Sequence, residues 1–148
     1  MDQFQQLLWD LGEIVEIPFH VDKNHSCNLL LDESLEVQMQ MDEHGEHLIL
    51  CAFVSEVPPG RFRENVLKDA LRVNSSFHPF GVFAFQEKKN LLLLQKLLPI
   101  EHLSGEKLLK ELEEFIEEAD EWRLALESGA SSPRKYNTVE GSPPPFIR

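Results

Sequence analysis

The chain has 148 residues, of which 42% are hydrophobic, and its 26 acidic against 14 basic residues give a net charge of −12. This length corresponds to one domain with an ordinary core. Because a negative surface repels phosphate backbones and anionic lipids, the charge argues against nucleic acid or a membrane as partners and favours a basic or partly unfolded polypeptide.

The first residues, MDQFQQ, lack the basic stretch and apolar run of a signal peptide. The longest apolar runs, such as LLLL at residues 91–94, are too short to span a bilayer. We therefore expect a cytosolic protein. Its two cysteines, Cys27 and Cys51, fall in strand-like runs and are expected to be reduced and buried.

The pattern predicts a helix over residues 2–15. Asp2 and Gln5 have the spacing of a capping box, and Pro18 lies beyond the helix end. Trp9 lies about 140° from Phe4 around the helix, among polar residues. It is either a ligand contact or a lone exposed or edge-packed aromatic residue. The residues expected to face the core are Phe4, Leu7, Leu8, Leu11, Ile14 and Val15.

Three strands are predicted next, at residues 28–31, 35–41 and 47–54, joined by the short turns DES and DEHGE. Short connections between successive strands predict an antiparallel meander. The middle strand, LEVQMQM, alternates apolar and polar residues, as expected when one face is buried and the other is a solvated or docking face.

A second helix over residues 61–73 is followed by a hairpin of strands 81–86 and 91–98, which ends at Pro99. A third helix runs from the cap residue Ser104 to about residue 128, with Gly129 as terminator. The order α-β-β-β-α-β-β-α predicts an α+β fold, in which helices cover an antiparallel sheet.

The third helix is amphipathic, and its acidic side is expected to be a solvated face. This side comprises Glu111, Glu113, Glu114, Glu117, Glu118 and Glu121. Residues 129–148 are rich in proline and serine and are predicted to form a flexible tail outside the domain of residues 1–128.

Histidines and glutamates cluster around the predicted hairpin turn, which raises the question of a metal site. The side chains concerned are Glu43, His44, Glu46 and His47, with His20 and His25 upstream. No HExxH or paired CxxC motif accompanies them, and a solvated turn has the same composition. No phosphate-binding loop or nucleophile motif occurs either. We therefore expect no metal site, no cofactor and no catalytic residues.

The second helix carries apolar residues over about half of its circumference, which is more than one sheet needs. This width indicates a homodimer interface, although a helix deep in a single core would have the same pattern. The candidate interface residues are Phe62, Val66, Leu67, Ala70 and Leu71.

The series FQQLLWDLGEIVEIPFHVDKNHSCNLLLDESLEVQMQM resembles the N-terminal half of the class I type III secretion chaperones, the CesT or Tir-chaperone family. The segments LILCAFVSEVPP, NVLKDALRVN and LSGEKLLKELEEFIEEADEWRLAL continue the resemblance to about residue 128. Phe115, Ala119 and Trp122 occupy positions where the family's last helix places an aromatic, a small residue and often a Trp. The members most resembled are those of chlamydia-like bacteria.

This resemblance implies a homodimer of α+β fold that binds the extended N-terminal segment of a secreted effector in the bacterial cytosol, without catalysis. It also implies delivery to the secretion apparatus, for example to its ATPase. An adaptor of the same fold that binds a folded partner is the alternative. The side chains that suit an effector surface are Trp9, Leu29, Leu31, Met39, Met41, Leu91 and Leu93, although Met39 and Met41 equally suit a core.

Overall fold

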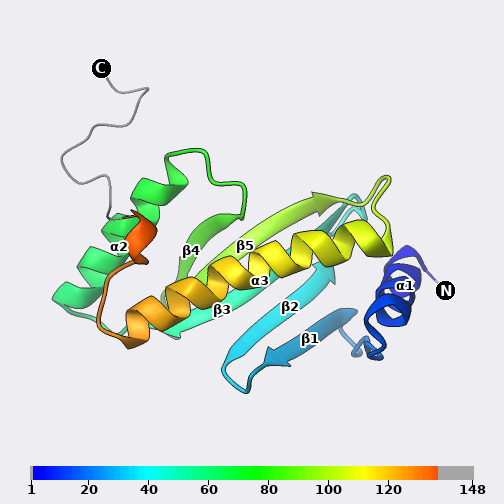
Figure 1. Ribbon diagram of the computed structural model, residues 1–148, viewed down its shortest axis with the longest axis horizontal. Coiled ribbons are helices and arrows are strands. Elements are labelled where there is room, and N and C mark those ends of the chain that lie inside the picture. Colours follow the sequence, from blue (N-terminus) through cyan, green and yellow to red (C-terminus); the bar gives the residue numbers. More distant parts are fainter. Residues whose placement is uncertain (1, 137–148) are drawn as a thin grey trace.

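Five antiparallel strands form one sheet in the order β1-β2-β3-β5-β4, and α3 crosses one of its faces (Figure 1). The structure is a computed structural model and describes residues 2–136. The elements are α1 (Gln3–Val15), β1 (Ser26–Leu31), β2 (Leu35–Met41), β3 (His47–Glu56), α2 (Arg61–Asn74), β4 (Val82–Gln86), β5 (Leu91–Pro99), α3 (Gly105–Glu127) and the short 3-10 helix η1 (Arg134–Tyr136).

The predicted α+β class and element order are confirmed. The third strand extends beyond the expected end, to Glu56, and a bulge between Phe53 and Ser55 shifts its register against β5. The first strand begins two residues earlier than expected, at Ser26. The expected capping box also forms, because Gln5 N–H donates to the Asp2 carboxylate at 2.8 Å while Gln5 Oε1 accepts from Asp2 N–H at 3.2 Å.

The core lies between the sheet and α3. Helix α1 packs on α3, on the side of the sheet where β1 starts and β2 ends (Figure 1). Alternate residues of β2 and β3 point into this core, as the period-2 pattern of LEVQMQM predicts. Met39 is one of them, and its side chain is fully buried opposite Leu50. It is therefore a core residue, and its assignment to an effector surface is corrected.

The acidic side of α3 was expected to be solvated, but one of its residues is buried. Glu118 is buried beside Trp122, whose indole Nε1–H donates to its carboxylate at 3.1 Å. A charge at this position needs partners, because an unpaired buried carboxylate is costly. Besides Trp122, the partners come from outside α3 and include Lys135 and Tyr136 of the segment that was expected to be a flexible tail.

That segment differs from the expectation in its described part. Residues 130–136 pack against α2 and α3, with Ser132 buried and Tyr136 partly buried against the core. Ser132 Oγ–H donates to Asp69 of α2 at 2.8 Å. The chain therefore stays packed for several residues beyond residue 128. Residues 137–148 lie outside the described residues.

Within residues 2–136, no helix is long and apolar enough to cross a membrane, and no group of three or more His, Cys, Asp or Glu side chains could hold a metal ion. In the predicted turn, His47 Nδ1 lies 3.1 Å from Asp42 Oδ2. Cys27 and Cys51 are both free and buried, as expected, and burial raises the pKa of both thiols.

Candidate functional site

A groove runs between α1 and the segment that follows it. Helix α1 buries its apolar side against α3, and this leaves Trp9 on the opposite side with 56% of its surface exposed. Beyond the helix, Ile17 is also 56% exposed. The groove is therefore bordered by two large apolar side chains that the single chain leaves in water.

The local backbone explains why the groove forms. Glu16 adopts the left-handed conformation at φ 59° and ends the helix, and the chain then turns back so that Ile17 N–H donates to Gly12 O at 3.2 Å. Gly12 permits this close approach because it has no side chain. Pro18 then restricts Ile17 to extended conformations. The returning segment consequently lies along the helix.

The groove encloses about 580 Å³. Its lining consists of Leu8, Trp9, Gly12, Glu13, Glu16, Ile17, Pro18, Phe19 and His20. A second concavity of about 340 Å³ shares Leu8, Trp9, Phe19 and His20 with it and adds Gln5 and Val21. Glu13 and Glu16 are exposed at the rim. The groove therefore suits an apolar side chain from a ligand with neighbouring positive charge.

The sheet face opposite α3 carries a second set of apolar side chains. Strand register places Leu30, Glu36, Phe53, Leu93 and Ala84 side by side across all five strands. Leu30 is exposed, and Phe53 is half-buried.

The next two rows on this face mix glutamines with apolar residues. One row joins Gln38, Cys51, Gln95 and the exposed Val82, and the other joins Gln40, Ile49 and the exposed Leu97. Because these glutamines flank the apolar side chains, the face is amphipathic rather than uniformly apolar.

The predicted strand residues divide between the two faces of the sheet. Leu29 pairs with Val37, and Leu31 pairs with Leu35, so both point to the core side, where they are partly buried. Both keep part of their surface exposed, so their assignment to effector binding stays a prediction, and Leu30 is the outward residue of β1. Met41 is likewise half-buried against the core.

Two predicted residues of β5 remain candidates for a ligand surface. Leu93 lies on the open face and is nearly buried by its neighbours. Leu91 is half-buried between Glu56 and Gln86. Neither residue is among the most exposed apolar side chains of the sheet.

Helix α2 likewise divides the predicted interface residues. Val66 and Ala70 are buried in the chain's own core, so their assignment to a dimer interface is corrected. Leu67 is half-buried against that core. Phe62, at 37%, and Leu71, at 65%, keep substantial exposed surface.

Sequence reasoning did not select Ile17, Leu30 or Leu97, although all three are more than half exposed. Ile17 stands next to a proline beyond a helix end, which is where a side chain leaves the helical face; this signal could have identified it. Leu30 and Leu97 sit in runs of leucine, where the period-2 pattern that tells the two faces apart is absent.

Comparison with known proteins gives a consistent assignment. The family model for the Tir chaperone protein (CesT) family matches residues 6–123. Among curated protein sequences, none matches the chain.

Solved structures share the fold at low sequence identity. A chain of the HopA1-SchA chaperone-effector complex is 24% identical with a TM-score of 0.66, covering 83% of this chain and 94% of its own. A chain from the Yersinia pestis type III secretion chaperone SycH in complex with a stable fragment of YscM2 is 19% identical with a TM-score of 0.62, covering 78% and 96%. A chain of the ExsC-ExsE complex is 22% identical with a TM-score of 0.66, covering 83% and 95%.

Proposed function

The chain belongs to the Tir chaperone protein (CesT) family, and from this membership we propose that it is a type III secretion chaperone that binds an extended segment of a secreted effector. The bound segment is the N-terminal, non-globular part of the effector. Binding keeps that part secretion-competent in the bacterial cytosol and brings it to the secretion apparatus, for example to its ATPase.

The groove beside α1 is the observation that carries this proposal. Trp9 and Ile17 expose apolar surface on either side of it, and exposed apolar side chains grouped around a groove mark a binding site. Aromatic side chains are frequent binding hot spots because they offer large contact area. The acidic rim residues Glu13 and Glu16 favour a ligand with basic residues next to its apolar anchor.

An extended ligand also suits the edge of the sheet. β1 is an edge strand, and the segment that borders the groove leads directly into it. A peptide added at such an edge satisfies its backbone hydrogen bonds there and places alternate side chains on each face. An unfolded segment can therefore be held along the groove and the sheet without folding into a globule.

We further propose that the chaperone acts as a homodimer through the outer side of α2. Leu71 lies on the opposite side of the helix from Val66, Ala70 and Val73, which face the core. With the half-buried Leu67 one turn earlier, it offers apolar surface that a second copy of α2 can cover. Two copies would give one effector segment a longer binding surface than one chain provides.

Co-purification with candidate effectors tests the function. Full-length chain would be co-expressed with each candidate secreted protein, and the complex would be treated with a low concentration of protease. A chaperone should protect one N-terminal segment while the free effector is degraded throughout. Protection of a compact effector domain, with no protected N-terminal segment, would instead indicate an adaptor for a folded partner.

A further inference from the structure

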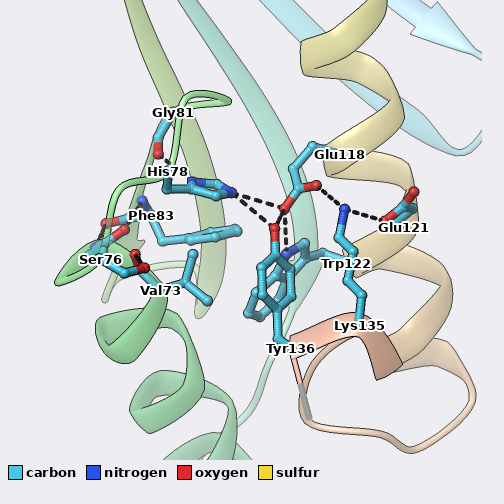
Figure 2. Close-up of polar contacts among 11 residues, drawn as sticks. Val73, Ser76, His78, Gly81, Phe83, Glu118, Glu121, Trp122, Lys135 and Tyr136 are labelled. Atoms are coloured by element: carbon cyan, nitrogen blue, oxygen red, sulfur yellow. Dashed lines mark hydrogen bonds and ion pairs between the residues drawn. The ribbon is translucent and has the colours of Figure 1, made fainter. Parts of the chain in front are cut away.

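A buried carboxylate joins three separate parts of the chain at one end of the fold. Glu118 of α3 is 2% exposed and accepts hydrogen bonds from Trp122, from the Tyr136 hydroxyl and, at 2.7 Å, from Lys135 Nζ (Figure 2). His78 Nε2 lies 2.9 Å from the same carboxylate. Glu118 therefore has donors from its own helix, from the C-terminal segment and from the loop between α2 and β4.

The loop is oriented by both nitrogens of the His78 ring. Nδ1 lies 2.7 Å from the carbonyl oxygen of Gly81, and the ring stacks on Phe83 with centroids 5.7 Å apart. A carbonyl and a carboxylate can only accept, so the ring satisfies both partners fully when both of its nitrogens carry a proton. Figure 2 shows the ring between Gly81 and the Glu118 carboxylate.

A second buried carboxylate holds the other end of the same C-terminal segment. Asp69 of α2 is nearly buried and accepts from Ser131 Oγ at 2.5 Å and from Ser132 Oγ at 2.8 Å. Arg72, one turn along α2, donates to its other oxygen at 2.7 Å. The segment is therefore fixed at both ends by hydroxyl groups that donate to buried acids.

We propose that residues 130–136 form a clasp that couples the C-terminal end of the described chain to the loop of residues 75–81, through Glu118. Opening the clasp removes the Tyr136 and Lys135 donors from Glu118. Of its four partners, the carboxylate then keeps only Trp122 and His78. The loop loosens with the clasp. The loop carries Phe77, which is 91% exposed, so the clasp also sets the position of that side chain.

The charges around Glu118 determine when the clasp is closed. Burial alone would raise the pKa of Glu118, but the donors His78, Lys135 and Tyr136 and the charge of Lys135 outweigh it and lower the pKa to about 2. Lys135 also pairs with Glu121 at 2.8 Å, and its own pKa is raised by these two carboxylates against the opposing effect of burial. Glu118 and Lys135 are therefore both ionised at neutral pH, and acid that protonates Glu118 opens the clasp.

Amide hydrogen exchange of the full chain tests the coupling. In Tyr136→Phe the ring that packs near Trp122 is kept and only the hydroxyl is lost. Exchange should become about tenfold faster in residues 130–136 and also in residues 75–83, because a hydrogen bond to a charged group is lost. The β1–β2 hairpin should keep its exchange rates. Arg134→Ala, at an exposed position of the same segment, serves as the control and should change neither region.

Glu118→Gln provides a second variant with nearly the same shape. It should accelerate exchange in both regions at neutral pH. In the wild-type chain acid should reduce the protection of residues 75–83, and in Glu118→Gln this acid-dependent loss should be absent. The coupling would be overturned if Tyr136→Phe accelerated amide exchange in residues 130–136 while residues 75–83 stayed protected. The result does not depend on effector binding, because the clasp residues lie outside the groove beside α1.

Discussion

The backbone of Gly12 lies so close to Ile17 that a Cβ atom at position 12 would stand 2.8 Å from the Ile17 carbonyl oxygen. This approach allows the segment after α1 to lie along the helix and form one side of the groove. A side chain at position 12 would have to displace backbone, which is less adaptable than a flexible side chain. The shape of the proposed effector site therefore depends on one glycine.

Gly12→Ala should separate binding from stability. Alanine favours a helix over glycine by up to about 1 kcal/mol, which offsets part of the strain from moving Ile17. We expect the melting temperature to change little and effector affinity to fall about tenfold, corresponding to about 1.4 kcal/mol. Calorimetric titration with the protected effector segment measures this. Gln3→Ala, at an exposed position near the start of the same helix, is the control.

Trp9→Ala should weaken effector binding roughly 30-fold or more, because truncating an aromatic anchor typically costs about 2–4 kcal/mol. The melting temperature should stay nearly unchanged, since the side chain is 56% exposed. Trp122→Ala should show the opposite pattern and lose about 3–5 kcal/mol of unfolding free energy, as expected for a fully buried Trp. Normal binding by a stable Trp9→Ala protein would place the effector elsewhere.

Leu71→Glu should convert the proposed dimer to a monomer that remains folded. The side chain is 65% exposed in the single chain, so a charge there costs little unless a partner covers it. In a dimer interface, an unpaired buried charge costs several kcal/mol. Light scattering at micromolar concentration measures the mass, with Lys68→Ala on the same helix as control. A monomeric wild-type protein would refute the dimer.

Acid should destabilise the protein through Glu118. Its pKa falls from an ordinary 4.5 to about 2 in the folded chain. A group with a depressed pKa stabilises the fold fully above pH 4.5, and this contribution of about 3 kcal/mol is lost as the pH falls towards 2. Urea unfolding at pH 7, 4 and 3 should show the decline. Glu118→Gln should be less stable at pH 7 and should decline less steeply.

The elements were predictable where the local pattern was strong. LEVQMQM alternates cleanly, and the observed β2 has the same ends, Leu35–Met41. Asp2 and Gln5 have the spacing of a capping box, and the box forms. In SCNLLL, three successive leucines hide the alternation. The outward residue, Leu30, is revealed only by the pairing of β1 with β2.

The clasp could not be predicted because its partners are far apart in the sequence. Glu118 looks like one more member of an acidic helical face, and its partner His78 is 40 residues away. Ser131 and Ser132 fall in a segment with the composition of a loop, yet they donate to Asp69 more than 60 residues earlier. Helical periodicity identifies apolar faces, but it does not identify a polar residue that tertiary contacts bury.

The fluorescence of Trp9 during titration with the protected effector segment tests the central claim most directly. The chain contains only two tryptophans, and Trp122 is fully buried, so acrylamide quenches Trp9 selectively. Binding in the groove should shift the Trp9 emission to shorter wavelength and reduce its quenching at saturation, and Trp9→Phe should abolish both changes. Saturable binding that leaves Trp9 emission and quenching unchanged would contradict a site in this groove.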